Sequence, residues 1–241
     1  MANARESHSV SWGTCYGVGV GPGDPELLTL KAARVIGACQ VVAAPQTRGG
    51  ATLALDIAAQ AVDLEGKDII RLPFAMSRDA GELQRMHEES VGLIAEQLAR
   101  GKDVAVLTLG DPGVFSSFFY LADGLRERGF AIEVIPGVTS FSAVAARLGE
   151  GLTEMDELLH VVPSAACADR IDGVLDLPGT KVLMKPCGKL GEIVEALERR
   201  GELSRASLVS DCGLPSEHVC RDLASFDPAE HPSYFTTLVV Q

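Results

Sequence analysis

Short apolar runs alternate along this chain with stretches of helical periodicity, and this alternation constrains the fold more than any other feature. The clearest apolar run is Val104–Leu109, VAVLTL, which is short enough for a strand buried on both faces. The clearest helical stretch is Ala80–Arg100, whose apolar residues share one side and which ends before Gly101. Repeated strand–helix units of this kind predict an α/β fold with a mostly parallel sheet covered by helices on both faces.

The remaining elements follow the same alternation. Further strands are expected at Thr14–Val20, Gln40–Ala43, Ile69–Leu72, Ile132–Ile135, Leu158–Val162, Lys181–Lys185, Ala206–Ser210 and Tyr234–Val240. Further helices are expected at Pro25–Gly37, Thr139–Leu148 and Lys189–Arg200.

The dipeptide Pro136-Gly137 interrupts this pattern near the middle of the chain. Proline restricts Ile135 to extended backbone, and glycine frees the turn that follows. The sequence contains no internal repeat and no long linker. It therefore predicts an N-terminal α/β domain over residues 14–135 and a C-terminal α/β domain over residues 136–241.

Composition and charge exclude several classes of protein. Hydrophobic residues make up 46% and charged residues 22% of the 241 residues, which is ordinary for a globular protein. The formal net charge of −12 argues against nucleic acid and anionic membranes as partners, since both require a basic surface. No apolar stretch is long enough to span a membrane, and the polar N-terminus lacks the apolar core of a signal peptide. A cytoplasmic protein is expected.

Neither cysteine nor histidine forms a metal-binding pattern. The six cysteines contain no C-x-x-C pair, and none of the five histidines has another three or four positions away. Isolated cysteines of this kind are typical of small core residues. No metal site is expected.

A glycine-rich turn joins the first expected strand to the first expected helix. Glycines at 17, 19, 21 and 23 lie at the carboxyl end of the strand, where α/β proteins bring backbone close to a ligand. The dinucleotide fingerprint G-x-G-x-x-G fails, because Pro22 or Asp24 stands where its third glycine should be. No Gly-Lys-Ser/Thr follows, so the turn is not a Walker loop either. A tight turn without a ligand remains an alternative.

Three further stretches have the composition of backbone-lined pockets. Leu109–Phe118 ends a buried strand in Gly-Asp-Pro-Gly, Ile135–Gly149 begins a helix after a Pro-Gly turn, and Val182–Gly188 ends a strand in Met-Lys. Each is common by itself, because Gly-Asp-Pro turns and Ser/Thr helix starts occur in many folds. Their order and spacing together indicate one family.

The chain resembles the tetrapyrrole methylase family in five successive segments: GVGVGPGDPELLTLKA, LPFAM, LTLGDPGVFSSF, IPGVTSFSAVAARLG and VLMKP. LPFAM and SFSAVAARLG are most similar to the precorrin-2/cobalt-factor II C-20 methyltransferases of that family. The resemblance implies two α/β domains, a homodimer, and S-adenosyl-L-methionine as co-substrate in the cleft between the domains. The implied reaction is methylation of a tetrapyrrole at C-20 in cobalamin biosynthesis.

The resemblance also implies roles for individual residues. Gly110, Asp111 and Val114 match the cofactor-binding Gly-Asp-Pro loop, and Ser116 and Ser117 follow it. The other implied cofactor contacts are Pro22, Thr139, Ser140, Phe141 and Met184, the last of which packs on adenine.

Four more residues are candidates for catalysis and for substrate binding. Asp24, beside the glycine turn, is the candidate acid or base, and its alternative role is an ordinary helix N-cap. A carboxylate-rich substrate requires cations in this acidic protein, and Arg48, Arg78 and Lys185 are the candidates. Each of these three could instead be a solvated surface charge.

Three alternatives to this function stay open. An NAD-dependent reductase is disfavoured by the failed fingerprint. A tetrapyrrole carrier or sensor without catalytic activity would use the same fold, and a methyltransferase of the same family could act at another ring position. The chain departs from the family pattern at Phe115, where tyrosine is expected, and at Ser117, where threonine is expected. These two changes leave the details of the substrate open.

Overall fold

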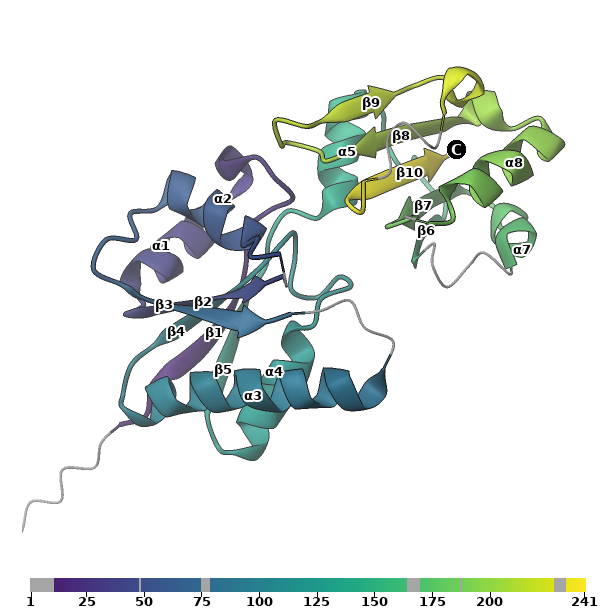
Figure 1. Cartoon of the computed structure of the whole chain (residues 1–241). Helices are drawn as coiled ribbons and strands as arrows, with labels where there is room; N and C mark the ends of the chain where they lie inside the picture. Colours follow the sequence, from purple (N-terminus) through teal and green to yellow (C-terminus); the bar gives the residue numbers. More distant parts are fainter. Residues whose placement is uncertain (1–10, 48, 75–78, 164–169, 187, 228–232) are drawn as a thin grey trace, which may run out of the picture. The chain divides into compact units, whose positions relative to one another are not determined.

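A computed structural model of the chain describes residues 11–47, 49–74, 79–163, 170–186, 188–227 and 233–241 (Figure 1). The chain divides into two compact units. The first extends to Gly21 and from Pro25 to Val138, and the second comprises Pro22–Asp24 and Thr139–Gln241. Each unit has its own five-stranded sheet.

The sheet of the first unit is parallel throughout, in the order β3-β2-β4-β1-β5. Its strands are β1 (Thr14–Gly19), β2 (Val41–Gln46), β3 (Asp68–Pro73), β4 (Val104–Thr108) and β5 (Ala131–Ile135). The central strand β4 is buried on both faces, as its apolar run predicts. The expected parallel sheet is confirmed in this unit.

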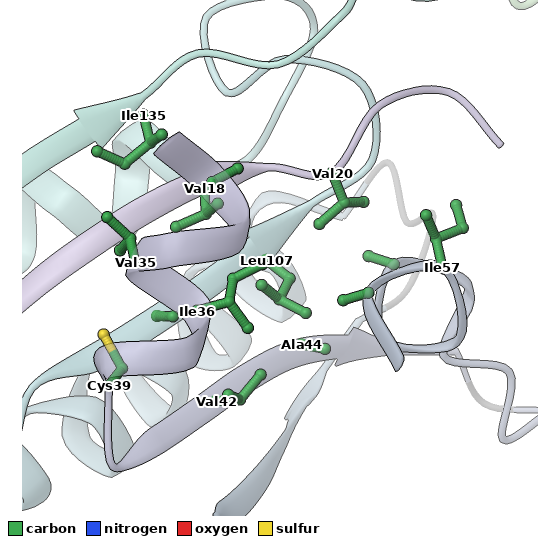
Figure 2. Close-up of a cluster of buried hydrophobic side chains, with 14 residues drawn as sticks. Val18, Val20, Val35, Ile36, Cys39, Val42, Ala44, Ile57, Leu107 and Ile135 are labelled. Carbon is green, nitrogen blue, oxygen red and sulfur yellow. The ribbon is translucent and has the colours of Figure 1, made fainter. Parts of the chain in front are cut away.

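Helices cover both faces of this sheet. They are the 3₁₀ helix η1 (Pro25–Leu27), α1 (Leu30–Ala38), α2 (Leu53–Ala61), α3 (Ala80–Ala99) and α4 (Phe118–Glu127). Figure 1 shows α1 and α2 on one face and α3 and α4 on the other. Figure 2 shows Val35 and Ile36 on the side of α1 that faces Val18 of β1 and Leu107 of β4. Residues of α3 and α4 form a second core on the opposite face.

The predicted continuous helix Pro25–Gly37 is wrong. The helical structure stops at the end of η1, and α1 begins only at Leu30. The reason is Thr29, whose backbone is extended and whose hydroxyl accepts a hydrogen bond from the Ala32 N–H at 3.1 Å. Thr29 therefore caps the α-helix, and Asp24 does not. Helices α2 and α4 were not predicted.

The sheet of the second unit has the order β6-β7-β10-β8-β9. Its strands are β6 (Leu159–Pro163), β7 (Thr180–Met184), β8 (Ala206–Ser210), β9 (His218–Cys220) and β10 (Thr236–Val240). β10 runs antiparallel to both β7 and β8, and β9 runs antiparallel to β8. The expectation of a mostly parallel sheet is wrong here, because an apolar run indicates that a strand is buried but not which way it runs.

The core of the second unit lies between this sheet and α7 (Ile171–Leu175), α8 (Leu190–Arg200), η3 (Leu203–Arg205) and η4 (Leu223–Ser225). Helix α5 (Ser140–Leu148) contacts β10. Leu183, Leu208 and Leu238, on three adjacent strands, pack with Ile193 and Leu197 of α8. Across the described parts of both units, no helix combines the length and the apolar character needed to cross a bilayer.

Candidate functional site

Three glycines from three different segments of the chain meet at the carboxyl edge of the first sheet. Gly19 ends β1, Gly110 follows β4 and Gly137 follows β5, and these strands are neighbours in the order β4-β1-β5. A Cβ atom on Gly19 would lie 2.6 Å from both the Gly110 carbonyl oxygen and the Gly137 nitrogen. A Cβ atom on Gly137 would overlap the same carbonyl oxygen. In this glycine crossing, formed by Gly19, Gly110 and Gly137, the packing therefore leaves no room for a side chain on Gly19 or Gly137.

The glycine-rich turn and the Gly-Asp-Pro loop are also hydrogen-bonded to each other. The Gly21 N–H donates to the Gly110 carbonyl at 3.2 Å, and the Gly110 N–H donates to the Gly21 carbonyl at 2.7 Å. Both residues have left-handed backbone, with φ of 80° and 71°. The conformation of each loop therefore depends on the other.

Asp111 connects the Gly-Asp-Pro loop to a second neighbour, the Pro-Gly turn, through its side chain. One carboxylate oxygen accepts the Gly113 N–H at 2.7 Å, and the other accepts the Gly137 N–H at 2.9 Å. The carboxylate therefore joins the Gly-Asp-Pro loop to the Pro-Gly turn. In this structure the Asp111 carboxylate holds backbone in place.

The rest of this loop leads into α4. Val114 donates its N–H to the Asp111 carbonyl at 3.2 Å. The Ser116 hydroxyl accepts the Phe118 N–H at 3.0 Å, and Ser117 occupies the N-cap position of α4. All of these predicted residues lie on one short segment at the edge of the sheet.

The predicted residues Thr139, Ser140 and Phe141 begin α5 in the second unit. The Thr139 hydroxyl is hydrogen-bonded to the Ser142 hydroxyl at 2.8 Å and caps the helix by accepting the Ser142 N–H at 3.4 Å. Ser140 and Phe141 follow in the first turn and are half-buried.

Met184 is the last residue of β7 and is buried. It pairs with Thr237 of β10, the strand that α5 contacts. Because neighbouring residues of a strand point to opposite faces, Met184 and Thr237 face away from the Leu183–Leu238 core. That Met184 shares one cofactor site with the glycine crossing stays a prediction.

The segment Pro22–Asp24 belongs to the second unit, although it lies within the glycine-rich turn. Pro22 and Gly23 are buried, and Asp24 is half-buried. A Cβ atom on Gly23 would overlap the Cys212 carbonyl oxygen, so this segment lies in backbone contact with the loop that follows β8.

The structure describes one of the three predicted substrate-binding cations. Lys185 follows β7 with a left-handed backbone, φ 56°, and donates its N–H to the Thr236 carbonyl at 3.0 Å. Its ammonium group lies 5.2 Å from the centre of the Tyr234 ring, within the range of a cation–π interaction. Arg48 and Arg78 lie outside the described residues.

Comparison with known proteins identifies the kind of protein that carries these loops. A family model described as Tetrapyrrole (Corrin/Porphyrin) Methylases matches residues 14–225, which include all five segments that resemble this family. The chain belongs to the tetrapyrrole methylase family.

Two curated relatives of this methylase are similar over almost their whole lengths. The cobalt-precorrin-2 C(20)-methyltransferase of Salmonella typhimurium is 33% identical over 95% of this chain and 96% of its own. The precorrin-2 C(20)-methyltransferase of a Sinorhizobium species is 32% identical over 96% of each chain. A solved uroporphyrin-III C-methyltransferase from Thermus thermophilus, in complex with S-adenosylhomocysteine, has the same fold, with a TM-score of 0.64 and 23% identity over 95% of this chain and 92% of its own.

The residues at the glycine crossing fit a cofactor that is bound by backbone groups. A Cβ atom on Gly110 would meet nothing nearer than the Val138 carbonyl oxygen at 3.9 Å. Gly19 and Gly137 are thus required by the packing of the methylase itself, whereas the space beside Gly110 is open to a ligand. Among the residues that the structure describes, no cluster of three or more histidine, cysteine or acidic side chains could hold a metal ion.

Two acidic residues of the second unit were missed. Asp211 follows β8 with φ 51°, and its carboxylate accepts hydrogen bonds from the Ser216 and Ser233 hydroxyls. Glu217 accepts the Gly213 N–H at 2.9 Å and pairs with Arg147. The sequence Asp-Cys-Gly directly after a predicted strand is a turn signal that could have drawn attention to this loop.

Proposed function

We propose that this tetrapyrrole methylase transfers the methyl group of S-adenosyl-L-methionine to C-20 of precorrin-2 or of its cobalt complex. The observation that carries this proposal is the similarity to two C-20 methyltransferases over 95% and 96% of this chain. The glycine crossing and the Gly-Asp-Pro loop supply the backbone of a cofactor site in the same chain.

Methyl transfer to carbon requires positioning more than activated side chains. When bound, S-adenosyl-L-methionine supplies an electrophilic methyl group, and the electron-rich C-20 carbon is the nucleophile. The two reactants must be held in line about 3–3.5 Å apart. We assign this positioning to the backbone around Gly110, to Thr139–Phe141 and to Met184. Asp24 is proposed to accept the proton that leaves C-20 after the new bond has formed.

The charge of the substrate requires local cations in a protein of net charge −12. We propose that Arg48, Arg78 and Lys185 bind its carboxylates. Arg78→Ala is expected to weaken tetrapyrrole binding by about 1–3 kcal/mol and to leave cofactor binding unchanged, because charge-assisted bidentate hydrogen bonds are strong. Arg78→Lys should restore only part of the affinity. An unaltered KM for the tetrapyrrole at low ionic strength would remove Arg78 from the site.

Product analysis tests the reaction directly. The protein is incubated with methyl-labelled S-adenosyl-L-methionine and, separately, with precorrin-2 or its cobalt complex, and the labelled methyl group is located by NMR. Label at C-20 supports the proposal, and the better substrate shows whether cobalt is inserted before this step. Label at another carbon would assign the chain to a different position in the same family. Binding of tetrapyrrole without transfer would instead indicate a carrier or sensor.

Calorimetry tests the cofactor separately. S-adenosylhomocysteine is expected to bind with a dissociation constant of roughly micromolar order, which corresponds to about −8 kcal/mol. NAD is expected not to bind, because Pro22 and Asp24 interrupt the dinucleotide fingerprint. Tight NAD binding without any heat from S-adenosylhomocysteine would reverse the assignment.

The family resemblance further suggests a homodimer in the cytoplasm. Light scattering coupled to size-exclusion chromatography tests the first point, since a dimer has twice the 25.4 kDa mass of one chain. Fractionation of the source cells tests the second.

A further inference from the structure

The loop that follows β8, residues 211–217, is held in shape by its own hydrogen bonds. The Leu214 N–H donates to the Asp211 carbonyl, and the Glu217 N–H donates to the Leu214 carbonyl, each at 2.9 Å. The hydroxyl of Ser216, in the second turn, donates to the Asp211 carboxylate at 2.9 Å and thereby connects the two turns. The loop is therefore a compact unit whose position depends on a few contacts.

Glu217 makes two of the contacts that position this loop. One carboxylate oxygen accepts the Gly213 N–H at 2.9 Å, and the other pairs with the guanidinium group of Arg147 in the last turn of α5. The Glu217 side chain is only 16% exposed, whereas that of Arg147 is 58% exposed. Burial would by itself raise the pKa of Glu217, but the Gly213 hydrogen bond and Arg147 outweigh it, and the pKa lies below its usual value. Glu217 is therefore ionised near neutral pH and connects the loop to α5.

Gly213 lies directly against the backbone of Asp24. A Cβ atom on Gly213 would stand 2.5 Å from the Asp24 nitrogen, and its φ of 81° also disfavours a side chain. Gly23 is equally close to Cys212. Both segments belong to the second unit, and no side chain separates them. The position of Gly23 and Asp24 therefore follows the position of Gly213.

We propose that Glu217 is a positioning residue for methyl transfer, which holds Gly213 and through it the Gly23–Asp24 segment in place. This proposal rests on the proposed function for its catalytic consequence, because Asp24 is the assigned proton acceptor. The loop offers no nucleophile of its own at this point: burial, with a contribution from Glu217, raises the pKa of the Cys212 thiol to about 11. The contribution of the loop is thus geometric.

Amide hydrogen exchange tests the positioning without any assay of activity. In Glu217→Ala, exchange in the peptide that covers residues 21–28 should become about tenfold faster or more, because loss of a hydrogen bond to a charged group is worth at least that factor. The matched control is Glu202→Ala, which removes a carboxylate of similar exposure, 21%, from its ion pair with Arg200 in the same unit. The control should exchange in this peptide as the unmodified protein does.

Methyl-transfer kinetics then test the catalytic consequence. At temperatures where both variants remain folded, kcat should fall about tenfold or more in Glu217→Ala and stay within about twofold in Glu202→Ala. Glu217→Gln should recover most of the loss, because its amide oxygen can still accept the Gly213 N–H. If Glu217 only stabilised the fold, Glu217→Ala would lower the unfolding temperature, but its kcat would stay close to that of Glu202→Ala.

Three outcomes would overturn the proposal: unchanged exchange over residues 21–28 in Glu217→Ala, an unchanged kcat in that variant, or an equal loss of kcat in the Glu202→Ala control. If the unmodified protein methylates neither precorrin-2 nor its cobalt complex, the proposed function fails on its own. The exchange experiment still decides in that case whether Glu217 positions the Gly23–Asp24 segment.

Discussion

The carboxyl edges of the two sheets use different residues for the same backbone conformation. In the first unit, the first left-handed residues after β1 and β4 are the glycines Gly21 and Gly110. In the second unit, the first left-handed residues after β7 and β8 are Lys185 and Asp211. A residue with a side chain costs about 1–2 kcal/mol in this conformation. The first edge thus presents bare backbone, whereas the second retains charged side chains at an energetic cost.

Strand direction explains how the second edge gains its polar groups. β10 enters between β7 and β8 in the opposite direction, so its amino end lies at their carboxyl ends. The Lys185 N–H donates to the carbonyl of Thr236, the first residue of β10, and the Asp211 N–H donates to the carbonyl of Phe235, which precedes it, each at 3.0 Å. Ser233 and Tyr234, which precede β10, thereby reach Asp211 and Lys185. In the parallel sheet of the first unit, by contrast, every strand ends at the carboxyl edge and none begins there.

The largest expected effect tests whether the first edge depends on bare backbone. Gly137→Ala places a Cβ atom onto the Gly110 carbonyl oxygen, and neither backbone segment can move freely, so the loss of unfolding free energy should be about 3 kcal/mol or more. Chemical denaturation measures this loss. Gly92→Ala in α3 is the control, since nothing lies within 4 Å of its Cβ position, and it should be neutral or stabilising by roughly 1 kcal/mol. Equal stability of the two variants would show that the glycine crossing can relax.

The next effect concerns ligand approach to the same edge. Gly110→Val should reduce affinity for S-adenosylhomocysteine by at least about thirtyfold, or about 2 kcal/mol, because its side chain enters the open space beside the loop. Titration calorimetry measures the change. Gly110→Ala carries the same φ with a smaller side chain, so it separates backbone strain from steric exclusion. A valine variant that binds as well as the unmodified protein would place the cofactor elsewhere.

A smaller effect distinguishes the second edge from the first. Lys185→Gly relieves the left-handed strain that Lys185→Ala retains, so the glycine variant should be more stable than the alanine variant by about 1 kcal/mol. Both variants should bind the tetrapyrrole more weakly, because both lack the ammonium group. Denaturant midpoints and tetrapyrrole titrations measure the two properties. If the glycine variant bound the tetrapyrrole normally, the Lys185 ammonium group would have no role in substrate binding.

The smallest effect is pH-dependent. The pKa of Glu217 is lowered in the folded protein, so its stabilising contribution is present above its unfolded pKa of about 4.3 and is lost as the pH falls through its lower folded pKa. Glu217→Gln should therefore be less stable than the unmodified protein by roughly 1 kcal/mol at pH 7, with the difference shrinking below about pH 4. Thermal unfolding across this range measures it. In an Arg147→Ala background the same substitution should cost less, and an undiminished cost would exclude the ion pair as its source.

Hydrophobic periodicity predicted most of the regular structure. Val104–Leu109 matches β4 to within one residue, and the expected helix Ala80–Arg100 matches α3 to within one residue. The helix Thr139–Leu148 became α5 with Thr139 as its N-cap, as a Ser/Thr start after a Pro-Gly turn suggests. These elements are recognisable because burial on one or both faces is recorded locally in the residue pattern.

Errors arose where local signals compete. Asp24 followed by Pro25 is as good a helix start as Thr29, and only the packed structure shows that the α-helix begins at the second of the two. Helix α4 was not predicted, because Ser116 and Ser117 directly before it continue the Gly-Asp-Pro loop and are typical of a turn as much as of a helix start.

The sequence by itself determined the α/β class, the order of the main elements and, through its motifs, the family. Only the tertiary structure decided that β10 runs against β7 and β8, that Gly19, Gly110 and Gly137 meet, and that Gly213 lies on Asp24. The physical reason is how far apart in the sequence the interacting residues lie. Burial and capping depend on residues within a few positions of each other, whereas strand direction and backbone contact depend on segments far apart in the chain, whose pairing no local pattern records.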